Sequence, residues 1–183
     1  AQCRDILDRI EEAESELAGR RGTASGLIRA SVPMSFGILH LMPLLAEFMA
    51  RHPGVRMELD YSDRRVDLIE EGFDVALRIA AQLPETQVAR KLTVCRSVVA
   101  AAPDYLARFG EPRHPDELAR HQCLCYSLAM RSSWPFVIDG EVRSVAVSGS
   151  FCANNGEALQ DAAVRGAGIV YQPTFLAAGA LRE

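Results

Sequence analysis

The stretch VRMELDYSDRRVDLIEEGFDVALRI, residues 55–79, decides the fold. Its two ends alternate apolar with polar side chains, with Val55, Met57, Leu59 and Tyr61 at one end and Phe73, Val75, Leu77 and Ile79 at the other. That period of two predicts two β-strands. Arg64 to Glu71, between them, predicts a helix closed by Gly72 at its C′ position. The stretch therefore predicts a strand–helix–strand unit.

Two elements upstream extend this unit. The short apolar run Leu27 to Val32 predicts a strand, and the spacing of Ile38, Leu41, Leu45 and Phe48 predicts a helix from about Gly37 to His52. Pro43 falls inside that helix, so we expect it to kink or restart there. The resulting order, βαβαβ, predicts a parallel sheet with right-handed crossovers.

A second α/β unit is expected to begin near Leu92. The expected elements are strands over 92–102, 123–127 and 169–171, helices opened by Pro103 and Pro115, a hairpin turning at Asp139-Gly140, and a helix end or turn over 177–180. A further helix is expected from Asn154-Asn155 to about Arg165. Asn154, followed three residues later by Glu157, has the form of a capping box.

The first twenty residues predict a separate helix. Ile6, Ile10, Ala13 and Leu17 form a narrow apolar stripe among charges, and Gly19 follows them. Such a stripe suits either pairing with another helix or lying on the surface of its own domain. The same stretch is too charged for a secretory leader, and no apolar run approaches the ~20 residues that a membrane span needs. We therefore expect a cytoplasmic protein, and the absence of an initial Met suggests a fragment.

Composition narrows the class of protein. The 183 residues carry 20 Lys+Arg against 24 Asp+Glu, a formal net charge of −4, and 49% of them are hydrophobic. These values are typical of a globular chain that is neither disordered nor membrane-embedded. The acidic balance argues against a nucleic-acid surface on these residues, since phosphate binding needs clustered Lys and Arg.

The cysteines are odd in number and scattered, at Cys3, Cys95, Cys123, Cys125 and Cys152. An odd set does not close a disulfide framework, which favours a reducing compartment. Cys123 and Cys125 form the one close pair, and alternation would place both sulfurs on one face of a strand. We expect buried thiols, with a metal or thiol-based redox role as the alternative.

Residues at the strand ends are the candidate site. Ligands of open parallel sheets bind at the carboxyl ends of the strands. In the first unit those ends deliver Ser35 and Phe36, Ser62 beside Asp63, and Arg78 with Ile79; in the second unit, Asn154 and Asn155 stand at a helix N-terminus. Helix N-termini favour negative charge, and an Arg fork matches a carboxylate. These residues therefore predict a small anionic or amphipathic organic ligand.

Each candidate also has an ordinary structural explanation. Ser35 and Asn154 are good helix caps that need no ligand. Arg78 could pair with Asp74 or Asp60, and Ser62 could simply form a turn.

Residues and motifs typical of catalysis or metal binding are sparse in the sequence. His40, His52, His114 and His121 stand alone, without a metal-ligand spacing. The sequence holds no GxSxG elbow, Walker loop or GxGxxG fingerprint, although a triad assembled in space stays open. We therefore expect no enzyme, no metal and no cofactor.

Six segments together carry a family resemblance. They are 26–33 with Phe36-Gly37; 43–45 with Phe48 and His52-Pro53; 67–78; 101–106 through Gly110; 115–118 with His121 and Cys123-Leu124; and 155–159 through 166–169. They cover almost the whole chain, and in this order they resemble the linker helix and effector-binding domain of a LysR-type transcriptional regulator.

The resemblance implies two Rossmann-like subdomains of the type 2 periplasmic-binding-protein kind. It implies a linker and dimerisation helix over 1–22, regulatory subdomain I over 23–91, subdomain II over 92–172, and over 173–183 a return crossover toward subdomain I. Crossovers near Lys91 and Pro173 would flank an effector cleft. Family members place effector contacts at the positions of Ser35, Ser62 and Arg78, and at the start of the helix after Asn154.

The resemblance also implies a bacterial sensor that works as a dimer or tetramer. A small metabolite, anionic or aromatic, would bias the two subdomains and no membrane would be involved. The chain departs from the family pattern in lacking the winged helix-turn-helix and in stopping soon after the second crossover, so DNA would be bound only through the missing N-terminal part. A solute-binding receptor of the same architecture is the alternative.

Overall fold

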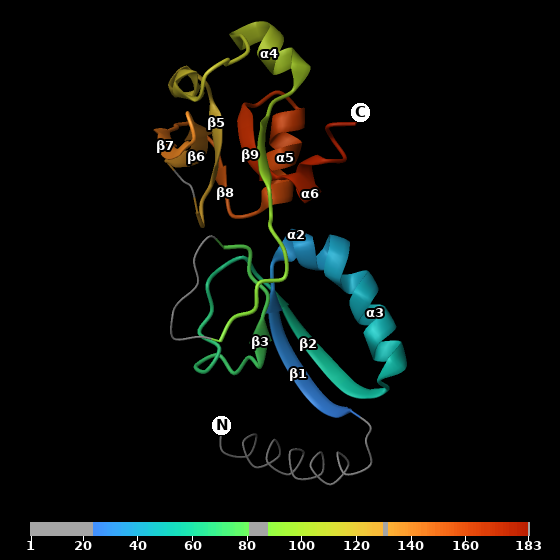
Figure 1. The fold of residues 1–183 in the computed structure, drawn as a ribbon. Helices are drawn as coiled ribbons and strands as arrows, with labels where there is room; N and C mark the ends of the chain where they lie inside the picture. Colours follow the sequence, from blue (N-terminus) through green and yellow to red (C-terminus); the bar gives the residue numbers. More distant parts are fainter. Residues whose placement is uncertain (1–23, 81–87, 130–131, 183) are drawn as a thin grey trace. The chain divides into compact units, whose positions relative to one another are not determined.

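The structure is a computed structural model that describes residues 24–80, 88–129 and 132–182. The helix expected over the first twenty residues, and Cys3 within it, lie outside the described residues. The chain divides into two compact units, with the division after Ile79. We describe each unit by itself and call them unit 1 and unit 2 (Figure 1).

A parallel sheet forms unit 1, as predicted. Its strands are β1 (Ser25–Val32), β2 (Gly54–Tyr61) and β3 (Val75–Ala76), in the order β2-β1-β3. β1 and β2 pair along their whole length, from Ser25 opposite Gly54 to Val32 opposite Tyr61. The strand expected over 73–79 is wrong in extent, since only two residues pair with β1.

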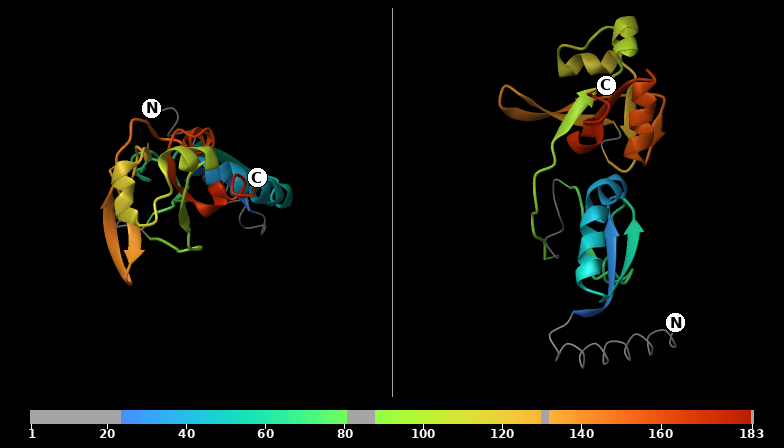
Figure 2. Two further views of the ribbon diagram at one scale, coloured as in Figure 1. Left: turned by 90° about the horizontal axis from the view of Figure 1, so that it is seen from above. Right: turned by 90° about the vertical axis from the view of Figure 1, so that its right-hand side faces the viewer.

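One helical segment in three parts connects β1 to β2. It consists of α2 (Met34–Phe36), a π-helical turn η1 (Gly37–Leu41) and α3 (Met42–Arg51). It begins three residues earlier than predicted and restarts at Pro43, as expected. The ring of Pro43 would clash with the carbonyl of Leu39 in a regular α-helix, and the wider turn just before it relieves that clash. Figures 1 and 2 show α3 running alongside β1 and β2.

The helix predicted from Arg64 to Glu71 is wrong. One helical hydrogen bond forms, from the Glu71 N–H to the Asp67 carbonyl at 3.0 Å. Gly72, at a φ of +66°, then ends the turn as a Schellman motif, in which the Phe73 N–H donates to the Leu68 carbonyl at 2.8 Å. The Asp67 carboxylate accepts from two backbone N–H groups just after it. Asp67 thus caps the start of the turn, and Gly72 ends it five residues later, so Gly72 has its predicted role on a single turn.

A mixed sheet forms the centre of unit 2. Its order is β4-β9-β5-β8, where β4 is Ser97–Ala100, β5 is Cys123–Tyr126, β8 is Cys152–Ala153 and β9 is Ile169–Pro173. β9 runs antiparallel to β4 and parallel to β5. The strand expected over 92–102 is wrong in extent, because residues 92–96 pair with no strand and leave Leu92 and Val94 largely exposed.

The other elements of unit 2 follow their sequence signals. The helices are α4 (Pro103–Phe109), the 3₁₀ helix η2 (Pro115–Arg120), α5 (Gly156–Val164) and the short α6 (Thr174–Ala177). The predicted hairpin is confirmed as β6 (Ser133–Ile138) and β7 (Glu141–Ala146). Its turn residues, Asp139 and Gly140, both have positive φ, which is the backbone of a type I′ turn.

Two apolar clusters pack in unit 2. One gathers Tyr105, Leu118, Cys123, Trp134, Val147 and Ile169, and the other gathers Leu124, Leu159, Ala163 and Val170. Consecutive residues of β5 alternate between them, so the clusters occupy opposite faces of the sheet. Cys123 and Cys125 are buried, as expected, but Cys95 and Cys152 are exposed thiols.

Candidate functional site

The carboxyl ends of the three unit 1 strands meet at one edge of their sheet. The Ser62 N–H donates to the Val32 carbonyl at 2.9 Å, and the Leu77 N–H donates to the Ser31 carbonyl at 2.9 Å. The segments that follow the strands and carry Ser35, Ser62 and Arg78 therefore start side by side. Within unit 1, the predicted meeting of the strand ends is thus observed.

Ser35 lies at this edge, but it does not cap the helix. The N-cap is Pro33, and Ser35 sits inside the first turn, 7% exposed. Asp63, which follows β2, takes the capping role instead, since its Oδ1 accepts from the Met34 N–H at 3.1 Å. A side chain of the chain itself therefore already holds a donor of this helix N-terminus. Phe36, on the next position, is half-buried and its ring centroid lies 5.3 Å from that of His40.

A hydrogen-bonded relay holds Arg78 at the same edge. Its Nη2 donates to the Ser31 hydroxyl at 2.6 Å, and its Nη1 donates to the Leu77 carbonyl at 2.7 Å. The Ser31 hydroxyl in turn donates to the Asp60 carboxylate at 3.2 Å. Ser31 is fully buried, so the hydroxyl that joins Arg78 to Asp60 is held in place by its surroundings. Sequence reasoning missed Ser31, although its place in β1, next to the predicted strand end, was visible.

Burial and charge act on Arg78 in opposite directions. Partial burial lowers the pKa of the Arg78 guanidinium, and the nearby carboxylates of Asp60 and Asp63 oppose that shift. The pairing with Asp60, one of two expected from the sequence, exists through Ser31. Asp74, the other expected partner, instead accepts from the Arg29 backbone N–H at 2.7 Å. Two of the five guanidinium donors are used in the bonds described above, and a fork of this kind can address an anion or a carbonyl.

Ser62 and Ile79 stand at the exposed rim of this edge. Ser62 is half-buried, and its hydroxyl accepts from the Arg64 N–H at 3.4 Å, which is the turn geometry expected as its ordinary role. Ile79 is 45% exposed and lies beyond the short β3. Both residues share the edge with Ser35, Phe36 and Arg78.

The predicted residues of unit 2 are offset by one position. Asn155, not Asn154, is the N-cap of α5, and its Oδ1 accepts from the Ala158 N–H at 2.8 Å. The capping box predicted between Asn154 and Glu157 is therefore wrong, because Glu157 lies only two residues after the cap. Asn154 is exposed and directly follows β8.

Gln172 ties the start of α5 to the sheet, which sequence reasoning did not foresee. This side chain is 3% exposed, and its Nε2 donates to the Gly156 carbonyl at 2.7 Å. A Cβ on Gly156 would lie 2.8 Å from Leu176 Cδ2 and 3.3 Å from the Gln172 amide oxygen. Glycine at this position therefore permits the close approach that seats the helix start.

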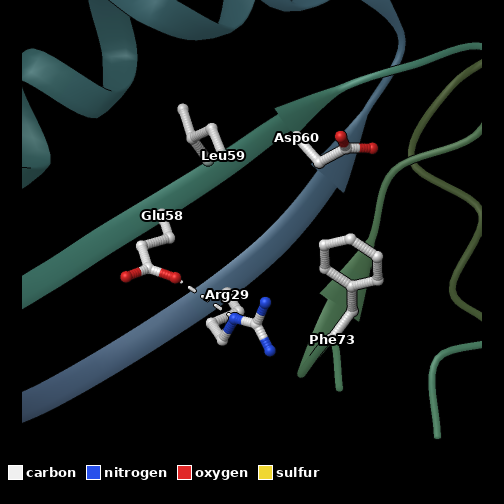
Figure 3. A pocket seen from close by; sticks show the side chains of 5 residues that line it. All are labelled: Arg29, Glu58, Leu59, Asp60 and Phe73. Atoms are coloured by element: carbon white, nitrogen blue, oxygen red, sulfur yellow. Dashed lines mark hydrogen bonds and ion pairs between the residues drawn. The ribbon is translucent and has the colours of Figure 1, made fainter. Parts of the chain in front are cut away.

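A separate cavity of about 220 Å³ opens on the polar face of the unit 1 sheet. Arg29, Glu58, Leu59, Asp60 and Phe73 line it (Figure 3). Arg29 is held inside by Glu58 at 3.2 Å, by the Gly72 carbonyl at 2.8 Å and by the Phe73 ring at 5.7 Å. The basic group of this cavity is thus committed to the chain's own carboxylate, carbonyl and ring.

Two features of other functions are absent from the described residues. In the described ranges, no three His, Cys, Asp or Glu side chains are grouped so that they could hold a metal ion. None of the helices in those ranges is long and apolar enough to cross a bilayer.

Comparison with known proteins gives a single family. The model of the LysR substrate binding domain matches residues 21–183. A transcriptional regulator of the HTH type from Haemophilus influenzae is 34% identical over 176 residues, which are 96% of this chain and 61% of that protein. The activator TtdR of Escherichia coli is 29% identical, over 91% of this chain and 54% of its own length. The chain thus spans about half to three fifths of these relatives.

Solved structures agree with the sequence matches. The regulatory domain of CrgA, a LysR-type transcriptional regulator from Neisseria meningitidis, superposes with a TM-score of 0.72 at 34% identity, covering 86% of this chain and 78% of that one. The full-length virulence activator AphB of Vibrio cholerae superposes with a TM-score of 0.75 at 28% identity, covering 99% of this chain and 62% of that one.

Proposed function

We infer that this chain, which belongs to the LysR substrate-binding-domain family, senses a small effector for a bacterial transcriptional regulator. The single observation that carries the proposal is the edge of unit 1, where Ser35, Ser62 and Arg78 follow neighbouring strands. The relatives are transcriptional regulators and not enzymes, which fits a binding role.

We propose that the effector meets the Arg78 guanidinium and the Ser35 hydroxyl. Its polar group would be one that Arg78 can hold, such as a carboxylate or a carbonyl, and its apolar or aromatic part would lie on Phe36 and Ile79. Asp60 and Asp63 stand close to Arg78 and offset its charge. We therefore expect at most one full negative charge on the effector, because a second would meet these carboxylates.

We propose that unit 2 contributes Asn154 and Asn155 to the same effector. Two binding surfaces on two units let a ligand shift the equilibrium between arrangements of those units. Such a ligand acts only if its affinity differs between the arrangements. This part of the proposal rests on the family resemblance and on the place of Asn155 at a helix N-terminus.

We assign DNA binding to a part of the protein outside these 183 residues. The chain covers about half to three fifths of relatives that are named for their helix-turn-helix. We also propose a cytoplasmic dimer or tetramer. Light scattering on the full-length regulator tests the assembly, and a monomer at working concentrations would overturn it.

A thermal-shift screen followed by titration tests the effector site. The screen uses the full-length protein and a panel of small monocarboxylates, aromatic acids and lactones, because a ligand specific for the folded state raises the melting temperature. Isothermal titration then compares the wild type with Arg78→Ala and with the control Arg143→Ala, which removes an exposed arginine of the β6–β7 hairpin.

We expect Arg78→Ala to weaken binding of a panel hit by about ten- to a hundredfold, the range for a lost charge-assisted hydrogen bond. Arg143→Ala should bind as the wild type does. Unchanged affinity in Arg78→Ala would remove this arginine from the site, and a hit insensitive to both Arg78→Ala and Ser35→Ala would place the site elsewhere.

A further inference from the structure

Two cysteines far apart in the sequence are direct neighbours in unit 2. Cys125 of β5 pairs with Cys152 of β8 in the parallel register, although 27 positions separate them along the chain. The register is fixed on both sides of Cys152: the Cys125 N–H donates to the Phe151 carbonyl and the Ser127 N–H donates to the Ala153 carbonyl, each at 2.9 Å. The placement of this pair thus rests on two backbone hydrogen bonds.

The geometry of the pair suits a covalent bond between the sulfurs. Register partners on neighbouring parallel strands lie roughly 4.8 Å apart and point to the same face of the sheet. A disulfide needs two Cα atoms about 4.4–6.8 Å apart. β8 has two residues and lies at the edge of the sheet, so it can make the small adjustment that brings the two Cβ atoms together.

The two thiols differ in their access to solvent. Cys152 is exposed, whereas Cys125 is 3% exposed. An oxidant therefore reaches Cys152 first, and Cys125, its register partner on the neighbouring strand, can act as the second thiol. Cys123, on the same face of β5, is fully buried and pairs with Ile169, not with a cysteine. Its burial also raises the pKa of its thiol to about 11, which leaves little thiolate at neutral pH.

We propose that Cys125 and Cys152 form a disulfide when the protein meets a hydroperoxide. The Cys152 thiolate attacks the peroxide, the O–O bond breaks, and Cys152 becomes a sulfenic acid while the alcohol, or water from hydrogen peroxide, leaves. The Cys125 sulfur then attacks the Cys152 sulfur, and its proton leaves with the hydroxide as water. Two thiols and one hydroperoxide thus give one disulfide, one alcohol or water, and one further water.

The bond would also reach the proposed effector site. β8 leads directly into Asn154 and Asn155, so the disulfide would tie the strand that carries these residues to β5. That consequence rests on the proposed function, whereas the disulfide itself does not.

Peptide mapping after oxidation tests the proposal on the full-length protein. Hydrogen peroxide is the probe, remaining thiols are blocked with N-ethylmaleimide, and trypsin digestion follows without reduction. Trypsin releases residues 121–131, with Cys123 and Cys125, and residues 144–165, with Cys152. We expect one linked species, lighter by two hydrogen atoms than the sum of peptide 144–165 and peptide 121–131 with one N-ethylmaleimide on Cys123, and abolished by dithiothreitol. Fragmentation should place the link on Cys125.

Single variants separate this pair from the other thiols. Cys152→Ser, at an exposed position, should abolish the linked species, and so should Cys125→Ser or Cys125→Ala. Cys123→Ala and Cys95→Ser should keep it. Far-UV circular dichroism and the thermal unfolding midpoint confirm that each variant is folded.

Several results would overturn the proposal. They are an unlinked wild type, a link mapped to Cys123, or a linked species that survives in a folded Cys125 variant. An effector that binds normally to the reduced protein would leave the proposed function standing in each of these cases, so the two proposals fail separately.

Discussion

The crossover helices of the two units, α3 and α5, differ in how many side chains they bury against their sheets. α5 buries Leu159 and Ala163 against the sheet of unit 2, whereas α3 has no buried residue and leaves Leu44 62% exposed. Among residues 24–80, 88–129 and 132–182, both apolar clusters belong to unit 2. Unit 2 is therefore held by apolar packing, and unit 1 is held to a larger extent by polar contacts.

The polar face of the unit 1 sheet shows those polar contacts. Arg29 and Ser31 of β1 stand opposite Glu58 and Asp60 of β2, so hydrogen bonds and an ion pair replace an apolar layer there. A parallel sheet usually buries both faces. In the described residues, the unit with the candidate edge therefore buries fewer apolar side chains than unit 2, which suits a part that must respond to a ligand.

The largest effect should come from the packing of unit 2. Leu159→Ala removes a side chain that is 1% exposed in the second cluster, and the transfer and cavity terms together should destabilise unit 2 by about 2–5 kcal/mol. Denaturant unfolding followed by fluorescence measures this, because the chain has one tryptophan, Trp134, and it is buried in unit 2. The matched control is Val164→Ala on the same helix, where the side chain is 56% exposed. Equal destabilisation by Leu159→Ala and Val164→Ala would mean that the buried face of α5 does not stabilise unit 2.

An intermediate effect should come from the polar relay of unit 1. Ser31→Ala leaves the half-buried Asp60 carboxylate and Arg78 guanidinium without their shared hydroxyl, and a hydrogen bond to a charged group contributes about 1.5–3 kcal/mol. Hydrogen exchange read by mass spectrometry should show faster exchange of the Ser62 and Leu77 amides, about tenfold for each 1.4 kcal/mol. Ser144→Ala, at an exposed hairpin position, should leave these rates unchanged. No change in Ser31→Ala would mean that polar contacts do not hold this edge.

Sequence patterns predicted the elements that depend on local signals. The alternation of residues 55–61, the Asp139-Gly140 turn and the Pro103 helix start each correspond to an element of the structure. They were predictable because a period of two, a pair of positive φ angles and a proline in the first turn act within a few residues. The parallel sheet of unit 1 followed from the predicted alternation of strands and connections, although the second connection holds a single helical turn and not the predicted helix.

The misses depend on contacts that no local pattern contains. The helix predicted at 64–71 shrinks to one turn because Asp67, three residues after the predicted start, is its N-cap. Ser35 was predicted to cap its helix, but Asp63, which follows the neighbouring strand, accepts from the helix N-terminus instead. Asn154 was predicted to cap α5, but the cap is the next residue, Asn155. Sequence placed the candidate residues at strand ends but could not show which of them the chain's own carboxylates already hold.

The smallest effect should come from that displaced cap, and it tests whether unit 1 depends on single polar contacts. Asp63→Ala removes the acceptor of the Met34 N–H, and loss of an N-cap side chain typically costs about 0.5–2 kcal/mol. Asp161→Ala in unit 2 is the matched control, because its ion pair with Arg165 at 2.8 Å is exposed, and exposed ion pairs contribute little to stability. We expect faster exchange of amides in the α2–η1 segment of Asp63→Ala and little change around α5 in Asp161→Ala. Asp63→Ala also uncovers a helix N-terminus that favours negative charge, so the affinity of a carboxylate effector should rise even as the local structure loosens. A fall in both affinity and protection would instead make Asp63 part of the binding surface.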